Sequence, residues 1–245
     1  MPASETINRS KRVDKVLEVE NLGVSFGTLE VFSALTFSVE SGTSLAVIGP
    51  NGAGKSVLFR ALIGAQKYDG VVRWAPGVRI GYVPQKLDIE RDLPLTGRDF
   101  LRAKAAVAKV GKDAIDRALE RVGIARDVIT RPIGAMSGGQ FQRLLVAFAL
   151  VGDPDVLMLD EPAAGVDAPG QEQLAEMLHG LRESKGVTLM VISHDLSVVF
   201  RHATNVICLA HGLRCIGAPR EVLTPATLNQ IYGTEVGFHV HDHLA

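Results

Sequence analysis

Three short apolar runs along the chain each end in glycine or in polar residues. They lie at 44–49 (SLAVIG), 156–160 (VLMLD) and 187–193 (VTLMVIS). Apolar runs of roughly four to eight residues are typical of strands that are buried on both faces of a sheet. The pattern therefore predicts three buried strands. In an open parallel sheet, ligands bind beyond the carboxyl ends of such strands.

A helix is predicted between the second and third of these strands. Apolar residues repeat there with the spacing of a single helical face, and Gly186 stands where the helix should end. The residues on this face are Leu174, Met177, Leu178 and Leu181. Strands that alternate with amphipathic helices of this kind predict a parallel α/β sheet.

A second group of helices is predicted between the first two strands. Thr96 and Asp99 have the spacing of a capping box, which predicts a helix that runs to Gly111. The segment DAIDRALERV predicts another helix, which ends at Gly123. Both predicted helices lie between the first and second buried strands.

Near the C-terminus, VICLAHGLRCIG predicts a β-hairpin with His211 and Gly212 at its turn. Pairing outward from that turn sets Cys208 opposite Cys215. The chain has 2 cysteines, which argues against a disulfide framework and is compatible with the cytosol. We expect two reduced strand thiols rather than a metal or redox pair, because no third ligand lies nearby in the sequence.

The composition is that of an ordinary soluble globular protein, with 47% hydrophobic and 22% charged residues. The 245 residues are enough for one large domain, or for one domain with an inserted lobe. The 26 basic and 27 acidic residues leave no basic excess, so nucleic acid is not an expected partner. No apolar stretch approaches the roughly 20 residues that cross a bilayer. The polar N-terminal MPASETINRSKRVDK is interpreted as a loose arm, not a signal peptide.

The first apolar run leads into GPNGAGKS at 49–56, which has the spacing of a phosphate-binding loop between a strand and a helix. Its three glycines allow the backbone to turn successive N–H groups toward an anion. The N-terminus of the following helix also favours negative charge. Lys55 should reach the β- and γ-phosphates of a nucleoside triphosphate, and Ser56 should offer its hydroxyl to Mg²⁺.

The other two strands end in candidate catalytic groups. Asp160 and Glu161 follow the second strand. Asp160 is placed to hold the hydration shell of Mg²⁺, and Glu161 could activate the attacking water as a general base. His194 follows the third strand and is expected to face the γ-phosphate, while Asp195 beside it is available as a helix N-cap.

The segment MSGGQFQRLLVAFAL has Ser137 as the expected N-cap of a helix, and its two glycines expose backbone amides to an anion. With SGGQ before a helix, a strand that ends in DEP and a histidine after the next strand, the chain resembles the ATP-binding cassette (ABC) ATPases. The resemblance implies an α/β fold with a P-loop NTPase (RecA-like) core, an antiparallel β subdomain and an inserted α-helical subdomain. The implied single domain spans 16–217, with the helical subdomain at about 86–150. A flexible arm at 1–15 and a C-terminal tail at 218–245 flank it.

The resemblance also assigns roles to residues that lie outside the phosphate loop. Phe26, in SFGTLEVF, stands where the family stacks an aromatic ring on adenine, although tyrosine is commoner there. Gln85, in IGYVPQK, matches the glutamine that touches Mg²⁺ and the attacking water and that signals to the transport partner. Asp167, in AGVDAPG, matches the aspartate of the loop between subunits, and Val166 replaces the usual leucine before it. Glu161, His194 and Gln85 form the implied catalytic set.

In this family the signature SGGQ of one subunit closes over the nucleotide on the phosphate loop of the other. The resemblance therefore implies a head-to-tail dimer that binds two ATP, with Mg²⁺ held at Ser56, Gln85 and Asp160. Val57 stands where threonine is frequent, which leaves the hydroxyl of Ser56 intact. The implied nucleotide-binding residues are Phe26, Gly49, Pro50, Asn51, Gly52, Ala53, Gly54, Lys55, Ser56, Val57, Ser137, Gly138, Gly139, Gln140 and Asp167.

The phosphate loop and the signature each occur once, without an internal repeat or a long coiled coil. The chain is therefore similar to importer ATPases, whose membrane permease is a separate chain and docks on the helical subdomain. An extracytoplasmic metal-binding protein is implied as an indirect partner. The expected location is peripheral, on the cytoplasmic side of the inner membrane. A soluble ABC ATPase without a transport role and an exporter remain alternatives.

Three stretches resemble the zinc and manganese importers, and within them the zinc-uptake ATPases. They are GYVPQKLDIERDLPLT, EPAAGVDAPGQ and SHDLSVVFRHATNVICLAHGLRCIGAP. Import of manganese or iron is the alternative. The C-terminal His239, His241 and His243 alternate along the chain, and Zn²⁺ accepts imidazole readily. We interpret this segment as a mobile terminus rather than a high-affinity site, and a weak zinc-sensing role stays open.

Overall fold

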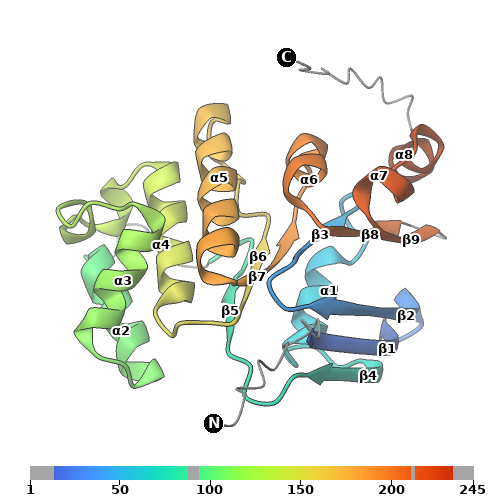
Figure 1. Ribbon diagram of the computed structural model, residues 1–245, viewed down its shortest axis with the longest axis horizontal. Helices are drawn as coiled ribbons and strands as arrows, with labels where there is room; N and C mark the ends of the chain where they lie inside the picture. The colour runs from blue at the N-terminus through green and yellow to red at the C-terminus, as the bar shows by residue number, and fades with distance from the viewer. Residues whose placement is uncertain (1–13, 88–93, 211–212, 234–245) are drawn as a thin grey trace, which may run out of the picture.

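The computed structural model describes residues 14–87, 94–210 and 213–233, which form two sheets and a set of helices around them (Figure 1). The strands are β1 (Lys15–Phe26), β2 (Leu29–Glu40), β3 (Ser44–Ile48), β4 (Asp69–Trp74), β5 (Ile80–Val83), β6 (Val156–Asp160), β7 (Thr188–Ile192), β8 (Asn205–Ala210) and β9 (Leu213–Gly217). The helices are α1 (Lys55–Leu62), α2 (Gly97–Ala108), α3 (Lys112–Val122), α4 (Gly138–Leu150), α5 (Ala168–Lys185), α6 (Leu196–His202), α7 (Pro219–Val222) and α8 (Pro225–Tyr232). Among these described residues, none of the helices is both long enough and apolar enough to cross a membrane.

The larger sheet has six strands in the order β5-β6-β7-β3-β8-β9. The strands from β5 to β8 are parallel to their neighbours, and β9 runs antiparallel to β8 at one edge. Every residue of β3 and β6 is buried, because other elements cover both faces of the sheet (Figure 1). The predicted parallel α/β sheet is confirmed, and the carboxyl ends of β3, β6 and β7 meet at one edge.

The smaller sheet is antiparallel, with the order β2-β1-β4. Helix α1 lies between the two sheets, and its Leu58 and Phe59 are fully buried in a cluster with residues from both. The indole Nε1 of Trp74 donates to the carbonyl oxygen of Leu62 at 2.8 Å and ties β4 to the end of α1. The antiparallel subdomain that the resemblance implied is confirmed.

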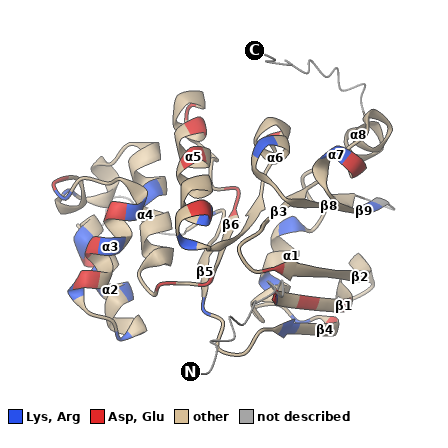
Figure 2. Ribbon diagram, viewed as in Figure 1, with Lys and Arg blue, Asp and Glu red and all other residues tan. Residues whose placement is uncertain are grey.

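The inserted helices α2, α3 and α4 lie together on the side of the larger sheet away from β9 (Figure 1). Thr96 forms the predicted capping box with Asp99. Helix α2 ends earlier than predicted, because Lys109 adopts a left-handed conformation, and Gly111 instead precedes α3 as its N-cap. Helix α3 ends at Gly123, as predicted. Basic and acidic residues are interspersed over α2 and α3 (Figure 2), in agreement with the balanced composition.

Two further helix predictions concern the segments after β6 and β7. Helix α5 carries the predicted buried face and ends at Gly186, whose φ of +65° closes it. Asp195 caps α6: its Oδ1 accepts hydrogen bonds from the backbone N–H groups of Ser197 and Val198 at 2.8 and 3.2 Å. Both predictions are confirmed. These features could be predicted because each depends on residues that are close in sequence.

Strands β8 and β9 form the hairpin that the sequence predicted, with Cys208 opposite Cys215. His211 and Gly212, the predicted turn, lie outside the described residues. The expectation of two reduced thiols is wrong for this structure, in which the two sulfur atoms form a disulfide. Direct opposition across the strands sets the Cα atoms 4.9 Å apart, within the range that a disulfide can bridge.

The folded region extends beyond residue 217, where the predicted tail begins. Helices α7 and α8 follow β9, and Leu223, Leu228 and Ile231 are buried in a cluster with residues of β3 and β8. Thr224 caps α8 by accepting a hydrogen bond from the backbone N–H of Thr227 at 3.2 Å. These two helices therefore belong to the packed core of the protein.

Candidate active site

The phosphate-binding loop connects the end of β3 to α1, as the sequence predicted. Helix α1 begins after Gly54 without a side-chain cap, so its first backbone N–H groups are available to an anion. The side chain of Lys55 is folded into the loop, where its Nζ donates to the carbonyl oxygens of Gly49 and Pro50 at 2.9 and 3.0 Å. Burial lowers the pKa of Lys55, and the charges of Glu161 and Asp160 oppose that shift.

Two glycines of the loop are required by close contacts. Gly49 has a φ of +148°, and a Cβ at this position would lie 1.9 Å from the carbonyl oxygen of Leu209 in β8. Gly54 has a φ of +91°, and a Cβ there would lie 2.5 Å from Cγ1 of Val31 in β2. The loop is therefore fixed in its path by both sheets.

Asp160, at the end of β6, is 2% exposed and lies beside the loop. Burial raises the pKa of the Asp160 carboxyl, and a hydrogen bond with Ser56 opposes this shift. Among the described residues, no donor reaches its Oδ1. A buried carboxylate oxygen without a partner is unfavourable. The pair of Ser56 and Asp160 offers oxygen atoms only, which is the donor set that Mg²⁺ prefers.

Glu161 follows Asp160 and is held by two residues from the loops that follow β5 and β7. Its Oε2 accepts a hydrogen bond from Nε2 of Gln85 at 2.6 Å, and its Oε1 lies 2.6 Å from Nε2 of His194. Glu161 has a φ of +50°, a left-handed conformation that is uncommon for a residue with a side chain. Backbone strain of this kind is frequent where a side chain must point into a site. The three predicted catalytic residues are therefore in direct contact.

These groups face a cavity of about 600 Å³. Phe26 lines it and is 49% exposed as a residue. Sequence analysis missed two apolar neighbours on β2, Leu29 and Val31. Leu29 lies opposite Phe26 in the β1–β2 register, so the pairing of the hairpin was the signal that could have found it. The other lining residues are Asn51, Gly52, Gly54, Lys55, Ser56, Val57, Gln85, Glu161 and His194. Gly49, Pro50 and Ala53 belong to the same loop without lining the cavity.

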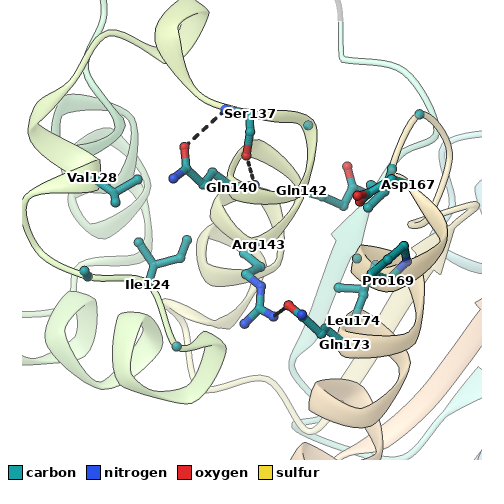
Figure 3. A pocket seen from close by; sticks show the side chains of 17 residues that line it. Ile124, Val128, Ser137, Gln140, Gln142, Arg143, Asp167, Pro169, Gln173 and Leu174 are labelled. Atoms are coloured by element: carbon teal, nitrogen blue, oxygen red, sulfur yellow. Dashed lines mark hydrogen bonds between the residues drawn. The ribbon is translucent and has the colours of Figure 1, made fainter.

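A second group of predicted site residues lies in a separate cavity of about 760 Å³, between the inserted helices and α5 (Figure 3). Ser137 and Gln140 form a capping box at the start of α4, which confirms the predicted N-cap. Gly138 and Gly139 line the cavity beside them, and Asp167 lies across it at the start of α5. The structure therefore does not bring the signature and the phosphate loop of one chain together.

Sequence reasoning missed Arg143 and Gln173, which also line this second cavity. Gln173 lies on the helix whose buried face was predicted, whereas only the N-cap and two glycines were singled out on the helix of Arg143. A contact between two helices leaves no mark in the spacing of apolar residues along either one. His239, His241 and His243 lie outside the described residues. Within the part of the chain that is described, no three His, Cys, Asp or Glu side chains are arranged to hold a metal ion.

Comparisons with known proteins agree with this geometry. The family model described as ABC transporter matches residues 32–164. A probable metal transport system ATP-binding protein from Thermotoga maritima is 40% identical over 221 residues, which are 89% of this chain and 90% of the relative. The zinc import ATP-binding protein ZnuC of Paracoccus denitrificans is 42% identical over 217 residues, which are 88% of this chain and 84% of the relative.

Two solved structures have the same fold over most of their length. One, an inward-facing ABC transporter described as of the metal-chelate type, gives a TM-score of 0.82 at 26% identity and covers 90% of both chains. The other is cbiO1 of Clostridium perfringens, part of the ABC transporter complex cbiONQ. It gives a TM-score of 0.75 at 27% identity and covers 89% of this chain and 94% of that one.

Proposed function

The chain belongs to the ABC transporter family, and we propose that it is the ATP-hydrolysing subunit of an importer that carries a divalent metal ion, zinc, through a separate membrane permease. The observation that carries the proposal is the contact of Glu161 with both Gln85 and His194 beside the phosphate-binding loop. This contact places a general base, together with two groups that orient it, next to the expected position of the γ-phosphate.

ATP binds in the cavity beside α1. Phe26 offers its exposed ring face to the adenine base, and the N-terminus of α1 faces the phosphates. Lys55 exchanges its two carbonyl acceptors for phosphate oxygens when the nucleotide enters. Charge-assisted hydrogen bonds to phosphate are stronger than those to a carbonyl, so the exchange favours binding.

Ser56, Asp160 and Gln85 would hold Mg²⁺. The unpartnered Oδ1 of Asp160 supports this assignment. When bound, Mg²⁺ neutralises part of the negative charge on the phosphates. Asp160 is buried and Ser56 lies in the first turn of α1, so both oxygen atoms are fixed before the ion arrives.

Glu161 acts as the general base for hydrolysis. A water molecule attacks the γ-phosphorus, the bond to the β–γ bridging oxygen breaks, and the proton of the water passes to the Glu161 carboxylate. Gln85 and His194 orient that carboxylate through the hydrogen bonds described above. Because His194 lies against Oε1, its Nε2 must carry the proton when Glu161 is ionised.

A second copy of the chain completes each site. The signature residues Ser137–Gln140 and the loop residue Asp167 line a cavity of their own, apart from the phosphate loop of the same chain. A head-to-tail dimer with twofold symmetry would place each signature cavity over the nucleotide of the other copy. ATP binding then closes the dimer, and hydrolysis reopens it.

Zinc is proposed as the cargo because relatives at about 40% identity over most of the chain are named for zinc import or metal transport. The permease would receive the motion of the dimer at the inserted helices, and an extracytoplasmic metal-binding protein would deliver the ion. The chain would therefore work as a peripheral subunit on the cytoplasmic side of the inner membrane.

Glu161→Gln tests the catalytic part of the proposal. The variant should bind MgATP with an affinity within about twofold of the wild type, hydrolyse it at least about 100-fold more slowly, and accumulate as a nucleotide-bound dimer. Glu172→Gln is the matched control, because its carboxylate forms an exposed ion pair with Arg201 away from the cavity. Rapid hydrolysis by Glu161→Gln would exclude Glu161 as the base.

A further inference from the structure

Arg143 connects three helices through one guanidinium group. It lies in the second turn of α4 and lines the signature cavity (Figure 3). Its Nη1 donates to the carbonyl oxygen of Val122, the last residue of α3, at 2.8 Å. Its Nη2 donates to Oε1 of Gln173 on α5 at 3.1 Å. The two donors of the fork therefore link α4 both to the inserted lobe and to the helix that follows Asp167.

A second contact joins the same two segments. A Cβ on Gly138 would lie 2.9 Å from the carbonyl oxygen of Gly165, so the start of α4 packs closely on the loop that leads into α5. Leu144 of α4 and Leu174 of α5 also belong to one buried cluster, so apolar packing joins the two helices as well. Two contacts at different heights along α4 fix the orientation of one helix relative to the other.

The energetics of the Arg143 contacts favour a role in orientation over a role in stability. Both acceptors are uncharged, and the bond to Gln173 is exposed to solvent. An exposed hydrogen bond contributes little to net stability, because water competes for both partners. The planar guanidinium of arginine nevertheless holds its donors in fixed directions and so fixes two acceptors relative to each other, whereas the three donors of a lysine ammonium group rotate about one bond.

We propose that Arg143 is a positioning residue that makes α4 and α5 move as one body. The signature residues at the start of α4 and Asp167 at the start of α5 then reach the nucleotide of the second copy together. This inference rests on the dimer of the proposed function. It predicts a defect in turnover and not in nucleotide binding, because the groups that bind ATP within the chain line the other cavity.

The test is a double-mutant cycle on steady-state ATP hydrolysis with Arg143→Lys, Gln173→Ala and the combination. Each single variant should lower kcat about fivefold, which corresponds to one hydrogen bond of about 1 kcal/mol, and leave KM within about twofold. The combination should be no slower than the slower single variant, because both remove the same link. Gln173→Glu keeps an acceptor oxygen and should retain the wild-type kcat.

Glu172→Ala is the matched control, since it changes the neighbouring residue on α5 and removes only an exposed pair with Arg201. Gln173 is exposed, so its alanine variant should fold even if a change at Arg143 lowers the melting temperature. An unchanged kcat in Gln173→Ala, or single effects that multiply in the combination, would overturn the inference. Failure of the proposed function would instead leave the wild-type protein without ATPase activity, or Glu161→Gln with rapid turnover.

Discussion

Gly49→Ala tests whether the phosphate-binding loop depends on its close approach to β8. The left-handed φ of Gly49 is unfavourable for alanine, and the new Cβ would meet the carbonyl oxygen of Leu209 at 1.9 Å. Since no carbon and oxygen atoms approach so closely without a bond, the loop or the strand must shift. A shift of the loop would also misplace the N–H groups that face the phosphates.

The expected loss combines two terms. Backbone strain at this φ costs about 1–3 kcal/mol, and overpacking at a close contact costs about 1–3 kcal/mol more. We therefore expect the free energy of unfolding to fall by about 3 kcal/mol and the affinity for MgATP to fall at least about tenfold. Gly64→Ala is the control: φ is +74°, but nothing lies within 4 Å of the added Cβ. It should cost about 1 kcal/mol and leave nucleotide affinity unchanged.

Urea unfolding gives the two free energies, and titration calorimetry with MgATP gives the two affinities. If Gly49→Ala and Gly64→Ala lose the same stability and both bind MgATP like the wild type, the contact with β8 does not hold the loop.

Substitutions at three further residues separate the roles of individual groups. Asp160→Asn should raise the melting temperature of the nucleotide-free protein at pH 7 while abolishing Mg²⁺-dependent hydrolysis. Burial raises the pKa of the Asp160 carboxyl, so the ionised carboxylate destabilises the folded wild type above that raised pKa. The difference in melting temperature between Asp160→Asn and the wild type should therefore vanish as the pH falls below the ordinary pKa of 3.8. A variant that melts at the same temperature as the wild type at every pH would contradict that burial effect. Phe26→Ala should weaken ATP binding about tenfold, whereas Phe26→Tyr should retain it, because tyrosine keeps the ring face; calorimetry that finds both variants equally weak would argue against stacking. Lys55→Ala should weaken ATP binding about 100-fold through the loss of charge-assisted hydrogen bonds to phosphate, and tight binding by this variant would remove Lys55 from the site.

The features that the sequence predicted well depend on residues near one another along the chain. The buried strands follow from uninterrupted apolar runs, and the caps at Thr96, Ser137 and Asp195 follow from polar side chains within three residues of the N–H groups they bind. The grouping of the catalytic residues in one site was also predictable, because the carboxyl ends of parallel strands lie at the same edge of the sheet.

Other features depend on which distant segments meet. The contact of Leu209 with Gly49 joins β8 to the phosphate loop, and the fork of Arg143 joins three helices. No periodicity within one segment encodes such a contact. The early end of α2 at Lys109 is different, since a left-handed lysine has no clear local signal. The packing of α7 and α8 went unrecognised because each helix is short and buries its apolar residues against other segments, which include β3, β8 and α6.

The most direct test of the central claim is the metal content of native cells that carry Glu161→Gln, grown with zinc and manganese both scarce. If hydrolysis at Glu161 drives zinc import, cellular zinc should fall while manganese and iron stay at the level of the wild type. A selective fall in manganese would contradict the choice of zinc. Zinc, manganese and iron all at wild-type levels would contradict metal import as the work of this ATPase.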